Sequence, residues 1–398
     1  MKLIRTVSIR LNIPKEEILP SIQAYTNAYN YIAQIGFEKK IYDGFQLHKL
    51  VYKESRELFG LPSQLAISAR IKAIESLKSI KTLRKKTQKK SKKELKVPHS
   101  KQQSIRLDER SYSINWKKNQ VSILTVSGRK KYDLKIADYY KQYLSWEYTS
   151  AELLIKKNKV WLKIVFQKEI NDFESNGHLI GIDRGINKLA VTSNNKFFGG
   201  GKVKHIVNKR RKQRASLQSK KTKSAKRHLK KLSGKERRFK EQVNHIISKQ
   251  IVSFLNPGDT IVIENLTGIR NNIRARKKLR TAINGWNFYQ LELFLTYKAE
   301  AKGIRVVHID PRYTSQRCSK CGSIDKKNRK NQSIFDCRKC GFKHNADLNA
   351  AKNICLKYLD STGYPDKVLV NEPNYISVRK NGDGNVSIEI SGTSSYFK

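Results

Sequence analysis

The chain has 398 residues, and its 83 Lys and Arg against 33 Asp and Glu give a formal net charge of +50 at pH 7. Hydrophobic residues make up 38% of it, which is enough to bury a core and excludes a globally disordered protein. A folded chain this basic repels itself and needs a polyanionic partner, of which nucleic acid is the usual one. The alternatives are a lysine-rich compositional bias and an anionic membrane surface, although no amphipathic helix with a bulky apolar face supports the second.

Membrane and export segments are not evident in the sequence. No stretch of about 18 apolar residues is present, which excludes a transmembrane helix. The first residues, MKLIRTVSIRLNI, alternate like a strand and lack the features of a signal peptide. Five cysteines, four of them clustered, argue against a secreted disulfide scaffold. We therefore expect an intracellular protein without a membrane partner, which in a prokaryote is cytoplasmic and associated with the nucleoid.

The first part of the chain changes between strand and helix periodicity. Residues 3–11 alternate as a strand, and a helix begins at Pro14, because a proline costs nothing in the first helical turn. A second helix is predicted from 62 to 96, and its terminal lysine run fits a solvated helix end and a nucleic-acid contact equally well. Strand alternation returns between 100 and 170, with a predicted hairpin turn at 156–159. The predicted parts are a small β-barrel, residues 1–13 and 97–170, and an inserted helical region, residues 14–96.

From residue 178 onward the pattern is that of an α/β domain followed by a polar tail. Short apolar strands alternate with long helices, and two of the strands end in an acid. The predicted strands are 179–183, 189–192, 196–198, 260–264 and 304–309, and the predicted helical segments are 203–255, 286–302 and 346–359. The tail, residues 361–398, is rich in Gly, Ser and Asn, which predicts disorder.

Four cysteines have the spacing of a zinc ribbon. Cys318 and Cys321 form one C-x-x-C pair, Cys337 and Cys340 form another, and 15 residues separate the pairs. Each pair can span one edge of a tetrahedron, and the glycine after each pair permits a tight turn. Because four thiolates leave no open coordination position, the predicted zinc is structural. Cys355 is predicted to be a buried small residue and not a ligand.

Three acids occupy positions that suit a hydrolytic metal site. Asp183 ends the strand LIGID, Glu264 ends the strand TIVIE, and Asp347 lies at a helix start in HNADLNAAKNI. A carboxylate at the end of a buried strand needs a partner, and a pair of Mg²⁺ or Mn²⁺ ions about 3.5–4 Å apart would supply it. Each acid alone is more often a turn or cap residue. Their joint occurrence with the cysteines and with basic segments favours the metal site.

Two strongly basic segments flank the second acid. Residues 201–240 hold 18 Lys and Arg against a single acid, Glu236, so this run is too one-signed to be neutralised internally. A further basic stretch, residues 270–280, follows Glu264. Both are predicted to contact nucleic acid, as are the basic residues around the cysteines. The aromatic residues after the second stretch, Trp286, Phe288 and Tyr289, are predicted to be core residues in preference to base-stacking platforms.

Five motifs together resemble TnpB, the nuclease family encoded by certain insertion sequences. They are GIDRG (181–185), VIENL (262–266), TSQRCSKCG (314–322), CRKCG (337–341) and NADLNAAKNI (345–354). This family is related to the compact type V CRISPR effectors and to the eukaryotic Fanzor proteins. The resemblance is specific over about 178–358, and no sharp motif supports it in 1–170.

The resemblance implies a multidomain α+β fold. Its N-terminal wedge-like β-barrel, with the helical recognition insertion, would hold a guide RNA and recognise a short motif beside the target. An RNase-H-like (RuvC-like) α/β nuclease domain, residues 178–312 and 345–360, would follow, with the four-cysteine zinc ribbon, residues 313–344, inserted as a target-binding element. Asp183, Glu264 and Asp347 would be the catalytic acids and the ligands of two magnesium ions.

The resemblance therefore implies an RNA-guided DNA endonuclease of a transposable element, with a guide RNA from its own locus and target DNA as partners. One alternative is a guide-bound regulator that does not cut, which the presence of all three acids disfavours. A second alternative is a transposase that transfers DNA strands. Strand-transferring enzymes of the RNase-H-like class order their acids Asp, Asp, Glu, whereas the order here is Asp, Glu, Asp, which favours cleavage.

Overall fold

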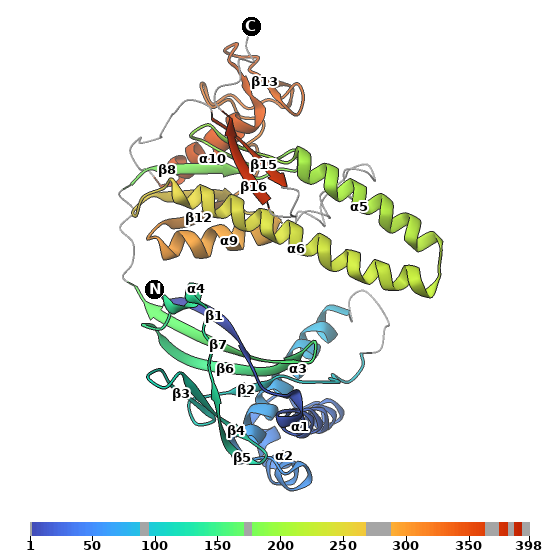
Figure 1. Cartoon of the computed structure of the whole chain (residues 1–398). Coiled ribbons are helices and arrows are strands. Elements are labelled where there is room, and N and C mark those ends of the chain that lie inside the picture. The colour runs from blue at the N-terminus through green and yellow to red at the C-terminus, as the bar shows by residue number, and fades with distance from the viewer. Residues whose placement is uncertain are drawn as a thin grey trace. The chain divides into compact units, whose positions relative to one another are not determined.

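The structure is a computed structural model, and it describes residues 2–87, 95–170, 177–267 and 288–362, with the backbone of two strands near the C-terminus. The chain divides into two compact units, Met1–Ile170 and Asn171–Lys398, which are described one at a time (Figure 1). The predicted mixture of helices and strands in more than one domain is confirmed, whereas the finer domain boundaries stay predictions. Among the described residues, no helix is long and apolar enough to cross a membrane.

The first unit contains two antiparallel sheets and a group of helices. The four-stranded sheet has the order β1-β7-β6-β2, and the three-stranded sheet has the order β3-β4-β5. The strands are β1 (Lys2–Leu11), β2 (Ile105–Leu107), β3 (Tyr112–Asn115), β4 (Gln120–Thr125), β5 (Gly128–Asp133), β6 (Glu147–Lys156) and β7 (Lys159–Glu169). The helices are η1 (Lys15–Glu17), α1 (Leu19–Glu38), α2 (Gly44–Phe59), α3 (Ser63–Thr87) and α4 (Asp138–Lys141).

The predicted hairpin turn is confirmed, because β6 ends at Lys156 and pairs with β7 from Lys159. The two connecting residues, Lys157 and Asn158, have φ values of 52° and 57°, which is the geometry of a two-residue turn whose twist matches the strands. Helix α2 was not predicted. Its signals are Asp43, whose carboxylate accepts hydrogen bonds from two amides of the first turn, and Gly60 at φ 61°, which ends it.

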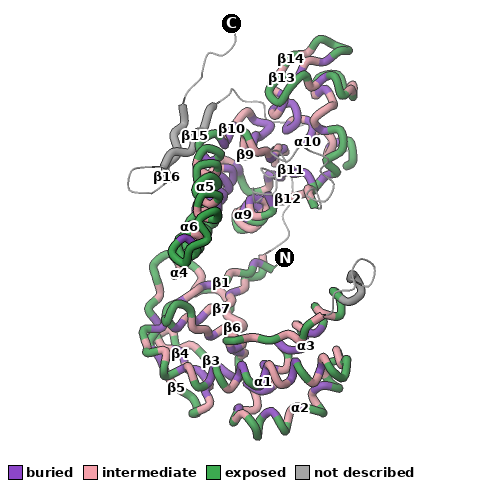
Figure 2. Tube along the Cα trace, turned by 90° about the vertical axis from the view of Figure 1, so that its right-hand side faces the viewer, coloured by how far each residue is buried: buried purple, intermediate pink, exposed green. Residues whose placement is uncertain are grey.

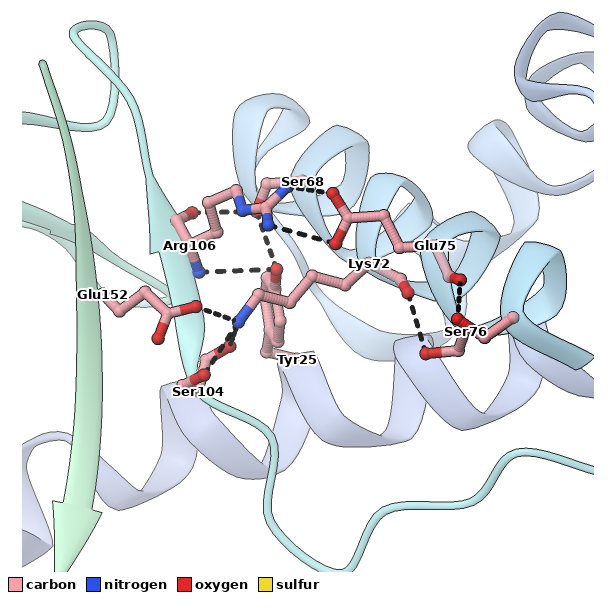
Figure 3. A network of polar contacts seen from close by, with 9 residues as sticks. Tyr25, Ser68, Lys72, Glu75, Ser76, Ser104, Arg106 and Glu152 are labelled. Atoms are coloured by element: carbon pink, nitrogen blue, oxygen red, sulfur yellow. Dashed lines mark hydrogen bonds and ion pairs between the residues drawn. The ribbon is translucent and has the colours of Figure 1, made fainter. Parts of the chain in front are cut away.

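Two ion pairs join a helix of the first unit to its sheet (Figure 3). The Lys72 ammonium of α3 lies 2.7 Å from the Glu152 carboxylate of β6, and the Arg106 guanidinium of β2 lies 2.7 Å from the Glu75 carboxylate of α3. Beside them, the hydroxyls of Tyr25 and Ser68 lie 2.9 Å apart. The Lys72 side chain, which is 7% exposed, therefore has the partner of opposite sign that a buried charge requires, whereas the Arg106–Glu75 pair is largely exposed. The lysine run that follows α3 falls largely outside the described residues.

The second unit is built on one mixed sheet of order β12-β11-β8-β9-β10-β15-β16. Strands β8, β11 and β12 are parallel, and β8, β9 and β10 form an antiparallel meander. The strands are β8 (Leu179–Asp183), β9 (Lys188–Thr192), β10 (Lys196–Gly199), β11 (Thr260–Glu264), β12 (Arg305–Ile309), β15 (Asn374–Lys380) and β16 (Val386–Ser391). The helices are α5 (Gly201–Ser219), α6 (Lys223–Ser253), α9 (Phe288–Ala301) and α10 (Ala346–Thr362).

Helices cover both faces of this sheet. Ile180, Ile182 and Ile263 face α6 and α9 within one core cluster, whereas Val262 packs with Ile354 of α10 on the other face. Helix α10 also crosses β8 so closely that a Cβ at Gly181 would lie 2.1 Å from a backbone oxygen of α10. Only glycine permits this approach, which explains the glycine inside the GIDRG motif.

Two segments of the tail differ from the predicted disorder. The backbone of β15 pairs in parallel with β10, and β16 pairs antiparallel with β15. Strand β10 otherwise presents one unpaired edge, and such an edge is a template for a further strand. The alternating sequence of both segments, with Asn-Gly-Asp-Gly between them, is a hairpin signal that the polar composition of the tail obscured.

Candidate functional site

The three candidate acids come from neighbouring elements of the second unit. Asp183 is the last residue of β8, Glu264 is the last residue of β11, and Asp347 lies in the first turn of α10. Because β8 and β11 are adjacent parallel strands, their carboxyl ends lie at the same edge of the sheet. Helix α10 packs against β8 and β11 on one face of the sheet. The fold thus brings together acids that stand far apart in the sequence.

The acids share one electrostatic environment. Burial, then the charges of Glu264 and Asp347, raise the pKa of Asp183 to about 8. Burial also raises the pKa of Glu264 and of Asp347 above their usual values. Buried like charges that shift one another in this way need a cation, and perturbed carboxyls of this kind are typical of functional sites.

Arg329 is a cation of this site that the sequence did not single out. Its guanidinium lies 3.0 Å from the Asp347 carboxylate, and its charge lowers the pKa of all three acids. Both residues of this ion pair are partly exposed, at 26% and 19% of their side chains, so the guanidinium can also reach a ligand. In the sequence Arg329 is one of many basic residues near the cysteines, and nothing distinguishes it there.

Two further residues fix Glu264. The Thr314 hydroxyl donates a hydrogen bond of 2.5 Å to the Glu264 carboxylate. The buried Arg184 guanidinium donates to the backbone carbonyl of Glu264 and to the carboxylate of Glu292 in α9. The other oxygen of Glu292 lies 2.9 Å from Nε2 of His308 on β12. This network holds the end of β11, so the Glu264 carboxylate has a defined position.

The four predicted cysteines come together. Their Sγ atoms all lie within 4.8 Å of one another, with Cys318 and Cys337 buried and Cys321 and Cys340 exposed. Within the described residues, these four cysteines are the group whose possible ligand atoms lie close enough together to hold an ion. The carboxylates of the three acids lie further apart than the four Sγ atoms. Four thiols on two tight turns suit a structural metal. Cys355 lies apart from them, buried beside Ser193, as predicted.

The cysteine module is attached to the helix that carries Asp347. It contains η2 (Lys326–Asn328), β13 (Ile334–Asp336) and β14 (Lys343–Asn345), and β14 leads directly into α10. The Asn349 side chain of α10 accepts from the Ser319 amide and donates to the Arg317 carbonyl. The module therefore positions Arg329 relative to Asp347 on a common frame.

The first basic segment forms helices α5 and α6. Helix α5 is exposed along most of its length and buries only Val203 (Figure 2). Glu236 pairs with Arg214 and Lys240, so this single acid neutralises only a small part of the segment. The second basic stretch and Trp286 lie outside the described residues. Phe288 is buried as predicted, but Tyr289 is 73% exposed and is not a core residue, because it is not among the residues of α9 that are buried.

Comparison with known proteins agrees with these features. A family model described as "Probable transposase" matches residues 165–272, and one described as "Cas12f1-like, TNB domain" matches residues 288–354. A TnpB-like protein of Methanocaldococcus jannaschii is 31% identical over 261 residues, which are 60% of this chain and 91% of that protein. This chain belongs to the TnpB family. The family predicted from the sequence motifs is therefore confirmed.

Two CRISPR-associated endodeoxyribonucleases named Cas12f1 are also similar to this TnpB-family chain. The protein of Sulfoacidibacillus thermotolerans is 45% identical over 134 residues, which are 33% of this chain and 30% of that protein. The protein of Syntrophomonas palmitatica is 32% identical over 270 residues, which are 54% of this chain and 53% of that protein. The chain thus spans about half or less of the length of these two relatives.

Proposed function

We propose that this protein is an RNA-guided DNA endonuclease associated with a transposable element, and that Asp183, Glu264 and Asp347 are its catalytic acids. The observation that carries the proposal is the convergence of these acids, each with a raised pKa, at one edge of the sheet. Membership of the TnpB family and the endodeoxyribonuclease relatives support DNA as the substrate.

The proposed catalytic domain is RNase-H-like, of the RuvC type. Its support is the strand order β10-β9-β8-β11-β12, in which an antiparallel meander is extended by two parallel strands. The helices on both faces and the order of the acids, Asp, Glu, Asp, agree with it. In the first unit, the two antiparallel sheets and the helices between β1 and β2 support the wedge-like barrel with its helical insertion.

Each residue of the site has a proposed role in phosphodiester hydrolysis. The three carboxylates would hold two Mg²⁺ ions, with Mn²⁺ as an alternative, and bound divalent ions activate water and neutralise charge at the phosphate. Thr314 and Arg184 keep the Glu264 carboxylate in place. Arg329, which pairs with Asp347 and is partly exposed, would bind a phosphate oxygen of the strand being cut. The four cysteines would hold a structural zinc ion.

The proposed partners are a guide RNA from the protein's own locus and target DNA. The net charge of +50 and the exposed basic helix α5 support a large polyanion. RNA guidance rests on the family and on the names of the CRISPR-associated relatives, because charge alone does not distinguish RNA from DNA.

Purification with RNA from the protein's own locus tests this function. We expect a defined RNA to copurify, and DNA that matches it to be cut in Mg²⁺ but not in EDTA. Asp183→Ala should abolish cutting, whereas Glu241→Gln, a change on α6 outside the site, should not. Random copurifying RNA without guided cutting would refute the proposal. Joining of DNA ends to new DNA would instead favour a transposase that transfers DNA strands; one matching family model is described as "Probable transposase".

A further inference from the structure

A pocket of about 340 Å³ lies in the second unit, beside the loop that joins β12 to the first cysteine pair. The loop contributes Arg312, Tyr313 and Thr314, the cysteine module contributes Ile324, and α10 contributes Lys357. None of the functions assigned above uses this pocket. Its walls combine an aromatic ring, an aliphatic side chain, the cations Arg312, Arg317 and Lys357, and one carboxylate, that of Asp360, which pairs with Arg317.

Tyr313 has a backbone conformation that is unusual for its side chain. Its φ is 67°, in the left-handed region, where a bulky residue is disfavoured and glycine or asparagine is the common choice. Its carbonyl accepts hydrogen bonds of 2.9 Å from the amides of Gln316 and Arg317, which closes the turn. The ring itself is not needed for this turn and is 56% exposed. A strained, exposed aromatic residue in a pocket is suited to contact a ligand.

The loop is held rigidly against α10. The Asn353 side chain donates a hydrogen bond of 2.9 Å to the Thr314 carbonyl. One turn further along α10, the Lys357 ammonium donates to the carbonyls of Asp310 and Arg312 at 2.8 and 2.9 Å. The loop therefore cannot turn away without breaking these bonds, and the pocket is formed before any ligand arrives.

One residue, Thr314, connects the pocket to the candidate catalytic site. Thr314, the residue after Tyr313, lines the pocket and also donates its hydroxyl hydrogen to the Glu264 carboxylate. Helix α10, which holds the loop through Asn353 and Lys357, carries Asp347 in its first turn. Because Thr314 contacts Glu264 and also lines the pocket, a nucleic-acid strand that is bound at the acids and follows this loop arrives at the Tyr313 ring.

The chemistry of the walls identifies the ligand. Tyr313 and Ile324, which is 53% exposed, offer apolar area. The Arg312 side chain is 80% exposed and makes only a long ion pair of 4.0 Å with Asp310, so its guanidinium is accessible to a phosphate. Aromatic rings beside cations are how proteins bind unpaired nucleotides, because every base has a face that stacks. We propose that this pocket binds one unpaired nucleotide of the DNA strand being cut, with its base on Tyr313 and its phosphate at Arg312. The choice of DNA rests on the proposed function.

Photo-crosslinking tests the pocket without requiring cleavage. The full-length chain would be irradiated with a single-stranded DNA that contains 5-iodouracil, a base that crosslinks to aromatic side chains on which it stacks. We expect the crosslink to map to Tyr313 and to persist in Tyr313→Phe. It should vanish in Tyr313→Asn, because asparagine tolerates the left-handed turn but has no ring. Equal melting temperatures of the three proteins would show that the turn is intact. Crosslinks elsewhere, or stronger crosslinks with the matched RNA, would overturn the assignment.

Cleavage at subsaturating DNA provides a second, independent measurement. Tyr313→Asn should slow cutting roughly tenfold, within the range expected for the loss of one base stack, and Tyr313→Phe should not. Tyr289→Ala, which removes an exposed tyrosine of α9 that does not line the pocket, is the control and should have no effect. If guided cutting is normal in Tyr313→Asn, the nucleotide pocket is wrong and the proposed nuclease stands. If Tyr313 crosslinks but wild-type protein does not cut, the proposed nuclease is wrong and the pocket stands.

Discussion

Charged groups are buried in both units, but with opposite consequences. In the first unit Lys72 approaches Glu152, and although burial alone would raise the pKa of Glu152, this partner holds it below its usual value. In the second unit burial and neighbouring acids raise the pKa of Asp183 to about 8. In the first unit the charges of Lys72 and Glu152 neutralise each other, and their ion pair holds α3 on the sheet. In the second unit Arg329 offsets only part of the charge of the three acids, and this remaining deficit supports the proposal that the acids bind cations.

The largest effect should follow from removing the metal that the four cysteines would bind as thiolates. These thiolates would be another group of like charges that needs a cation. Cys337→Ser, or extraction with a strong chelator, should loosen the module and displace Arg329 from Asp347. Because structural zinc can contribute on the order of 10 kcal/mol to folding, we expect a clear fall in melting temperature and loss of most cleavage. Calorimetry and zinc analysis would measure this. Cys355→Ser, which changes the buried cysteine outside the cluster, is the control, and unchanged melting of Cys337→Ser would contradict a structural metal.

Arg329→Gln should remove a positive charge from the site of the three acids and so increase its excess of negative charge. Removing one cationic donor from such a site typically slows catalysis by about 10²-fold or more, and Arg329→Lys should recover part of this. Because Arg329 lowers the pKa of Asp183, Glu264 and Asp347, its loss raises all three. The rise of cleavage rate with pH should therefore move to higher pH. A uniform loss at every pH would show that Arg329 acts without affecting the acids.

Lys72→Met tests the balanced arrangement. The change leaves Glu152 without its partner, and we expect a loss of about 2 kcal/mol in the free energy of unfolding, moderated because the Glu152 side chain is 38% exposed. Adding Glu152→Leu should recover much of the loss, since an apolar pair can replace an ion pair. Denaturant unfolding would measure both variants. Equal stability of wild type and Lys72→Met would mean that this ion pair does not hold α3.

The smallest expected effect is on the stability of the metal-free protein and its dependence on pH. Because the pKa of Asp183 is raised on folding, ionising it destabilises the folded chain, and the penalty grows as pH rises from about 4 toward 8. Asp183→Asn should therefore stabilise the metal-free protein at pH 8, by an amount on the order of 1 kcal/mol, and have no such effect near pH 4. Thermal melts in EDTA would measure it. Added Mg²⁺ should reverse the ranking, and a stabilisation independent of pH would contradict the raised pKa.

The sequence predicted the parts of the site that depend on local spacing. The cysteine pairs and the strands that end in Asp183 and Glu264 were found because their patterns span only a few residues. That the acids meet depends on the parallel pairing of β8 with β11 and on α10, contacts between distant segments that no local pattern encodes.

The residues that support the site could not be predicted. Thr314, Arg184 and Arg329 act through single hydrogen bonds or ion pairs made across the fold, and their residue types are common in this basic chain. Helix α2 is different, because its cap residues at both ends were visible in the sequence and were overlooked. The strands of the tail were likewise visible as alternation but were outweighed by composition.

Gly181 sets the thickness of the second unit at its centre. Its missing side chain lets α10 lie directly on β8, with a backbone oxygen where a methyl group would be. The distance between Asp183 on β8 and Asp347 on α10 therefore depends on the absence of a side chain at position 181. Gly181→Ala would push α10, which carries Asp347, away from β8, which carries Asp183. A single added methyl group would thus change the spacing of the acids while leaving every charge in the protein unchanged.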